Sequence, residues 1–179
     1  AVMASYYLEH IEGCKNPKIG LVNIGEEPNK GSELYQETYK LLNQKLSNFI
    51  GNVEGRHLLT SEANVLVCDG FVGNTVLKFA ESWVNVFSEE ISSRIKEKTS
   101  YKIGAALMKP VFNSLKKNYD YEEHGGTPLL GLNGVCIIAH GSSGIKSIKN
   151  SIFVAKKCVE EQLALNTKRT IETFLAEEK

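Results

Sequence analysis

The 179-residue sequence lacks most of the features that would assign it to a specialised class of protein. Its 21 basic residues are balanced by 21 acidic ones, and no basic block occurs, so nucleic-acid binding has little support. No run of about 18 apolar residues is present, and we therefore expect no segment that spans a bilayer.

Cysteine and histidine are few and scattered. The four cysteines and four histidines form neither a CxxC pair nor an HxxxH spacing, so we expect no metal site. Cys68 and Cys136 lie inside apolar, strand-like runs. This setting is typical of reduced, buried thiols and predicts a cytoplasmic protein.

The most informative segment that is present runs from Val65 to Trp83. Residues 65–68 are apolar and rich in valine, which predicts a buried strand. From Asn74 onward, apolar residues recur at helical spacing. The turn between them (DGFVGN, residues 69–74) therefore lies at a helix start, where free backbone N–H groups favour an anion. A plain helix capped by Asn74 is the structural alternative.

Strand-like and helical segments alternate along the chain. We expect strands over residues 18–24, 50–53, 65–68 and 134–140. With helices between them, this order predicts an α/β fold with a mostly parallel sheet covered on both faces. Right-handed crossovers would then bring the carboxyl ends of all strands to one edge, where ligands of such sheets bind. Polar residues and glycines follow the strands at residues 23–25, 54–55, 69–70 and 140–141.

A long helix over residues 74–98, about 37 Å in length, is followed by a second helical stretch over residues 110–118. The segment between them, residues 99–107, is apolar and flanked by lysines. We interpret this as a helical hairpin with an apolar tip. Such a tip can contact a membrane surface or a twin subunit, or pack against its own domain.

Several strings in the chain match a known family. They are NIGEEPNKG (residues 23–31), FIGNVEGR (49–56), VCDGFVGN (67–74), YDYEEHGG (119–126) and GGTPLLGLNGVCIIAHGSS (125–143). Together, in this order, they resemble the bacterial PlsX-type phosphate acyltransferases over about residues 2–168. We therefore expect residues 1–179 to be a single α/β domain, the C-terminal half of a longer chain, with the hairpin of residues 74–118 within it.

The resemblance implies a function, a fold and partners. Members transfer a fatty acyl group from acyl carrier protein to inorganic phosphate, in phospholipid synthesis. The implied fold is a three-layer α/β/α arrangement similar to phosphotransacetylases and isocitrate dehydrogenases. The implied protein is a homodimer without a metal or nucleotide cofactor. Its hairpin is the expected dimer contact and the expected contact with a membrane surface, which would make the protein peripherally membrane-associated.

This chemistry requires a held phosphate, a polarised thioester carbonyl and a proton for the leaving thiolate. We predict that Lys30 balances the charge of phosphate, and that Asp69 orients Lys30 or passes a proton. An ordinary loop lysine and a turn-stabilising aspartate are the alternatives. Eight further residues are expected to bind substrate: Asn23, Glu27, Gly70, Gly73, Asn74, His140, Gly141 and Ser142.

Two further expectations concern the second half of the chain. His124 leads a glycine-rich loop and ranks below His140 as a site residue. The helix after His140 carries lysines that we expect to form a docking face for the acidic acyl carrier protein, with a merely solvated face as the alternative. These are Lys146, Lys149, Lys156 and Lys157.

Two other functions are compatible with parts of the sequence. One is a short-chain phosphate acyltransferase that acts on acyl-CoA, which the turn at residues 69–74 does not exclude. The other is a non-catalytic nucleotide-binding α/β domain. The second is weakened because neither GxGxxG after the first strand nor GxxxxGK[ST] occurs in the chain.

Overall fold

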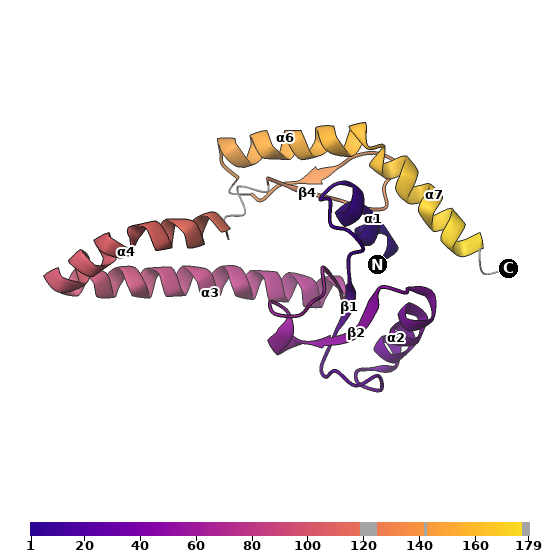
Figure 1. Ribbon diagram of the computed structural model, residues 1–179, viewed down its shortest axis with the longest axis horizontal. Coiled ribbons are helices and arrows are strands. Elements are labelled where there is room, and N and C mark those ends of the chain that lie inside the picture. The colour runs from indigo at the N-terminus through magenta and orange to yellow at the C-terminus, as the bar shows by residue number, and fades with distance from the viewer. Residues whose placement is uncertain (119–124, 142, 177–179) are drawn as a thin grey trace. The chain divides into compact units, whose positions relative to one another are not determined.

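The computed structural model describes residues 1–118, 125–141 and 143–176 (Figure 1). The chain divides into two compact units. Unit 1 combines Ala1–Cys68 with Gly125–Lys179, and unit 2 is Asp69–His124. The assignment of residues 1–179 to a single domain stays a prediction.

A three-stranded parallel sheet forms the first part of unit 1. Its strands are β1 (Ile19–Asn23), β2 (Phe49–Glu54) and β3 (Val65–Val67), in the order β2-β1-β3. All are parallel to β1, as predicted for the first three strands. The central strand is the most buried, because Ile19 and Leu21 are 0% and 2% exposed. This confirms an α/β fold, whereas the three-layer arrangement stays a prediction.

Helical segments follow β1 and β2 along the chain. Helix α2 (Glu33–Lys45) begins after Ser32 and packs against β2. A single 3-10 turn, η1 (Gly55–His57), follows β2 directly. The carboxyl ends of β1 and β2 therefore lie side by side, since Asn23 pairs with Glu54 in the register.

The prediction of a fourth strand over residues 134–140 is wrong in the length of the strand and in the strand with which it pairs. Only Ile137–Ile138 (β5) is extended, and it pairs antiparallel with β4 (Thr127–Pro128) in a separate two-stranded sheet. The proline limits this ladder, because it has no N–H to donate. His140 and Gly141 therefore do not follow a strand of the parallel sheet.

Helix α6 (Ile145–Glu160) packs against this small sheet, and α7 (Leu163–Ala176) packs against both α6 and α1 (Val2–His10). Their shared core contains Ile11, Cys158 and Leu163. The buried thiol is thus Cys158. Cys136 is exposed and Cys68 is half-buried, so the predicted burial of these two cysteines is wrong.

Helix α6 turns its serines inward and its isoleucines outward. Ser147 and Ser151 are buried, whereas Ile148 and Ile152 are 47% and 65% exposed. The cause is a close approach to the backbone at Gly125, where a Cβ atom would lie 2.5 Å from the Ser151 nitrogen. Only small side chains fit on that face of the helix.

The described part of unit 2 contains α3 (Gly70–Glu97) and α4 (Thr99–Asn118), which pack against each other. The protruding hairpin of residues 74–118 stays a prediction. The segment from Thr99 to Leu107, expected as a tip, is helical and belongs to α4. Helix α3 carries exposed aromatic side chains, with Trp83 54% and Phe87 51% exposed.

Among the helices of the described ranges, none is both long and apolar enough to cross a membrane.

Candidate functional site

The loop that follows β1, residues 24–31, is closed by one buried side chain. Asn23 is 7% exposed and ends β1. Its Oδ1 accepts the N–H of Ile24 at 2.8 Å, and its Nδ2 donates to the carbonyl oxygen of Lys30 at 3.0 Å. A single amide therefore holds both ends of the loop. The sequence predicted a catalytic role for Lys30 and a substrate-binding role for Asn23, and the structure brings the two residues into contact. Both roles stay predictions.

Glycines allow the loop to close this tightly. Gly31 has a φ of +86°, and a Cβ atom there would lie 2.6 Å from the Oδ1 of Asn23. A Cβ atom on Gly25 would lie 3.0 Å from the Cγ of Lys30. The methylene stem of Lys30 therefore lies close to Gly25, where a larger residue would meet it.

Strand β2 supplies a second anchor, from a residue to which the sequence reasoning gave no role. Asn52 is 8% exposed, and its Nδ2 donates to the carbonyl oxygen of Glu27 at 2.8 Å. The same carbonyl oxygen accepts the backbone N–H of Lys30 at 3.1 Å. A polar residue at a buried strand position within FIGNVEGR was the available signal.

Two contacts between basic and acidic side chains lie at this loop. Lys30 Nζ lies 3.8 Å from Glu27 Oε1, and His57 Nε2 lies 3.5 Å from Glu26 Oε1. The Lys30 side chain is 45% exposed, so this pair contributes little to stability. Lys30 can therefore exchange Glu27 for an incoming anion at small cost. His57 likewise has no predicted role from the sequence.

Asp69 caps helix α3, which corrects the expected helix start. The helix begins at Gly70, four residues before Asn74, and Asp69 Oδ1 accepts the N–H of Val72 at 2.9 Å. Asn74 is therefore not the cap, and Gly70 and Gly73 belong to the first turn of the helix. A carboxylate at Ncap complements the positive end of the helix dipole. It also weakens the attraction of that end for a second anion.

Lys30 lies in unit 1 and Asp69 in unit 2. The pairing of Lys30 with Asp69 therefore stays a prediction, as do the substrate-binding roles of Gly70, Gly73 and Asn74.

The predicted residues after β5 lie in the connection to α6. His140 is exposed, and its carbonyl oxygen accepts the N–H of Ser143 at 2.9 Å. Gly141 lies in this turn, and the hydroxyl of Ser143 is 3.0 Å from that of Ser147 on α6. Ser142 and His124 lie outside the described residues. The binding roles of His140 and Gly141 stay predictions.

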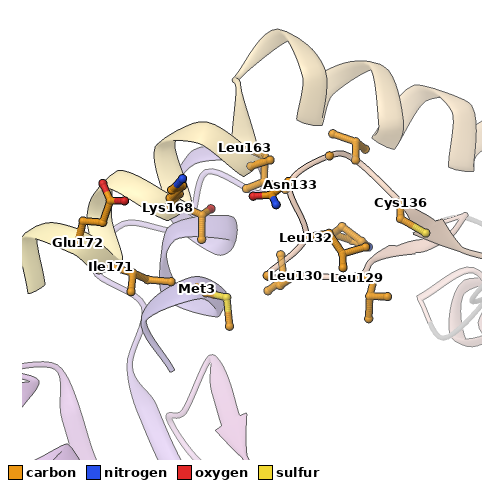
Figure 2. A pocket seen from close by; sticks show the side chains of 16 residues that line it. Met3, Leu129, Leu130, Leu132, Asn133, Cys136, Leu163, Lys168, Ile171 and Glu172 are labelled. Atoms are coloured by element: carbon orange, nitrogen blue, oxygen red, sulfur yellow. The ribbon is translucent and has the colours of Figure 1, made fainter. Parts of the chain in front are cut away.

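A separate pocket of about 270 Å³ lies between α1, the loop of residues 128–136 and α7 (Figure 2). Its lining is mostly apolar and includes Met3, Leu130, Leu132 and Ile171. Lys168 and Glu172 contribute one charge of each sign, so the pocket has no excess charge that would attract phosphate. It suits an apolar group.

Within the described ranges, no group of three or more metal-ligating side chains occurs.

Comparison with known proteins shows relatives over most of the chain. A family model described as "Fatty acid synthesis protein" matches residues 1–166. A phosphate acyltransferase of Clostridium botulinum (strain ATCC 19397 / Type A) is 48% identical over 163 residues, which are 91% of this chain and 49% of that protein.

Two further relatives carry the same name, phosphate acyltransferase. That of Dictyoglomus turgidum is 52% identical over 161 residues, 89% of this chain and 48% of the relative. That of Desulfitobacterium hafniense is 48% identical over 177 residues, 98% of this chain and 53% of the relative. The chain thus spans about half the length of the curated relatives it matches.

Proposed function

The chain belongs to the fatty acid synthesis protein family, the PlsX-type family, and on this premise we propose that it carries the phosphate site of a phosphate acyltransferase. The enzyme would convert a long-chain fatty acyl thioester and inorganic phosphate into acyl phosphate and a free thiol. The single observation that supports this most strongly is the Lys30 loop. Two buried asparagines hold the backbone of this loop at the edge of a parallel sheet, where such folds bind ligands.

The chemistry can be written with these residues. A phosphate oxygen attacks the thioester carbonyl carbon, and the new C–O bond forms as the carbonyl oxygen becomes negative. The C–S bond then breaks, and the thiolate takes a proton. Lys30 would leave Glu27 and balance the charge of phosphate. Asp69 would orient Lys30 or pass the proton.

The proposed acyl donor is acyl carrier protein, and the pathway is phospholipid synthesis. Two lysines of α6 fit a docking face for an acidic partner. Lys149 lies 5.8 Å from the ring centroid of Phe153, and Lys156 pairs loosely with Glu160 at 3.6 Å. Lys157 is less available, because its ammonium donates to the carbonyl oxygen of Ile11.

Charge reversal tests this face. The variants Lys149→Glu and Lys156→Glu should raise KM for acyl carrier protein, while Lys40→Glu on α2 should not. An unchanged KM in both α6 variants would rule out the face.

The exposed apolar side chains of α3 and α4 support a homodimer formed through unit 2, and contact with a membrane surface at the turn around Lys98. Large unpartnered apolar patches mark such interfaces. Sedimentation would report the dimer, and flotation with anionic vesicles would report the membrane contact. A monomer that does not float would contradict both.

The donor distinguishes this proposal from a short-chain, acyl-CoA-dependent enzyme. Thiol release is measured with long-chain acyl carrier protein or with acetyl-CoA, each with and without phosphate, and acyl phosphate is identified by phosphorus-31 NMR. We expect phosphate-dependent release with the long-chain donor. Release from acetyl-CoA alone would favour the short-chain enzyme, and nucleotide binding without release would favour a non-catalytic domain.

A further inference from the structure

We propose that Asn52, on β2, is the positioning residue that holds the Lys30 loop in its phosphate-binding conformation. This inference rests on the proposed function of Lys30. Asn52 donates from Nδ2 to the carbonyl oxygen of Glu27, and that same oxygen accepts the backbone N–H of Lys30. Two hydrogen bonds therefore connect a buried strand residue to the backbone of the cationic residue through a single atom.

The two asparagines hold different parts of the loop. Asn23 contacts the first residue, Ile24, and the carbonyl oxygen of Lys30, so it closes the ends. Asn52 reaches the middle of the loop at Glu27, 25 positions away in sequence. The pair of His57 with Glu26 is largely exposed and holds the loop only weakly. Gln36 on α2 donates from Nε2 to the carbonyl oxygens of Asn29 and Gly31, at 3.0 and 3.1 Å, and so holds the last residues of the loop. At Glu27, the side chain that holds the backbone is that of Asn52.

The hydrogen bonding of Asn52 is unusual for a residue that only stabilises a strand. Its Oδ1 is buried and has no hydrogen-bond partner among the described residues. Burying an amide oxygen without a partner is unfavourable, and asparagine is depleted in strands. An apolar side chain would suit this position better for stability alone. The bond from Nδ2 to the loop is the property that an apolar residue would lose.

The chain offers a matched control at the other end of the same strand. Asn48, just before β2, donates from Nδ2 to the carbonyl oxygen of Pro17 at 2.6 Å. It is the same residue type with the same kind of bond to the backbone. It lies at the opposite edge of the sheet, because β2 runs from Phe49 to Glu54. Asn48→Asp therefore reproduces the chemical change of Asn52→Asp without touching the Lys30 loop.

The first measurement is hydrogen exchange on a peptide that covers residues 24–31. Asn52→Asp places an oxygen against the Glu27 carbonyl oxygen, so exchange in this peptide should rise about tenfold. Asn48→Asp should leave it unchanged. Unchanged exchange in Asn52→Asp would overturn the inference whatever the activity of the protein.

The second measurement is phosphate-dependent thiol release by the full-length protein. In Asn52→Asp, kcat/KM for phosphate should fall on the order of 10- to 100-fold, since a displaced catalytic group is that costly. In a Lys30→Ala background, Asn52→Asp should cause no further loss, because Asn52 acts through Lys30.

Full activity of Lys30→Ala would overturn the proposed function. Loss of activity in Lys30→Ala together with parental kinetics in Asn52→Asp would overturn only the role of Asn52.

Discussion

Replacing Gly31 by alanine should distort the loop that carries Lys30 and lower the free energy of unfolding. The residue has a φ of +86°, and this left-handed conformation costs an alanine about 1–2 kcal/mol. The new Cβ atom would also lie 2.6 Å from Asn23 Oδ1 and 2.8 Å from the Cβ of Tyr35. Overpacking of this kind costs about 1–3 kcal/mol. The expected loss is the sum of the two, about 2–5 kcal/mol.

Two other glycines separate the contributions. Gly13 has a φ of +73°, and a Cβ atom there would meet no described atom beyond its chain neighbours within 4 Å, so Gly13→Ala should show the backbone cost alone. Gly55→Ala has open space and no left-handed φ, so it should show neither cost. Urea unfolding followed by circular dichroism measures all three, and with a slope of about 2 kcal/mol per molar the midpoint of Gly31→Ala should fall by about 1–2.5 M. Equal midpoints for Gly31→Ala and Gly55→Ala would refute the reasoning.

Three further changes test other parts of the structure. Asp69→Ala should lower the free energy of unfolding by about 0.5–2 kcal/mol, because the side chain that caps α3 is lost, and Asp69→Asn should lower it by less. Equal melting temperatures for both variants and the parent would contradict the cap. Ser151→Leu should destabilise the protein by about 1–3 kcal/mol, because Ser151 is buried. Ile148→Ser should change stability by less than about 0.5 kcal/mol, because Ile148 is exposed. The reverse order in thermal melts would show that α6 packs through its other face. Burial, and next the hydrogen bond to Glu12, raise the pKa of Tyr7 above its usual value of 10.0, so its contribution to stability is complete below about pH 10 and falls as the pH rises further. Unfolding measured from pH 8 to 11 should show a decline that Tyr7→Phe reduces, and an identical decline in this variant would contradict it.

The sequence predicted the strands of the parallel sheet because their signal is local. The valine-rich run at Val65 and the apolar run that begins at Ile19 indicate buried strands without knowledge of their neighbours. The pairing partner of a strand is not local information. Ile137 and Ile138 are extended, as their β-branched side chains predict, but they pair with Thr127–Pro128 and not with the parallel sheet.

Helix boundaries and faces were less predictable, for two physical reasons. Asp69 and Asn74 are both good N-caps, and the apolar residues between them fit either start, so periodicity could not choose. On α6, isoleucines recur at a spacing typical of a buried face, but the close approach of Gly125 leaves room there only for small side chains. Close backbone contacts between distant segments decided this face, and hydrophobic pattern alone does not report them.

The candidate site was predicted in part. Lys30 and Asn23 were selected from one motif, and the structure connects them through a hydrogen bond. Asn52 was missed, because its role depends on a carbonyl oxygen 25 residues away on a different element. A polar residue at a buried strand position is the signal that could have identified it.

The central claim is that Lys30 binds phosphate, and a pair of lysine variants tests it most directly. Lys30 and Lys40 each pair with a glutamate three positions earlier, at 3.8 Å and 2.6 Å, so the two changes remove the same kind of surface ion pair. Phosphate-dependent thiol release is measured for Lys30→Ala and Lys40→Ala. We predict that Lys30→Ala lowers kcat/KM for phosphate by about 100-fold or more, while Lys40→Ala retains the parental value. Parental kinetics in Lys30→Ala would contradict the account.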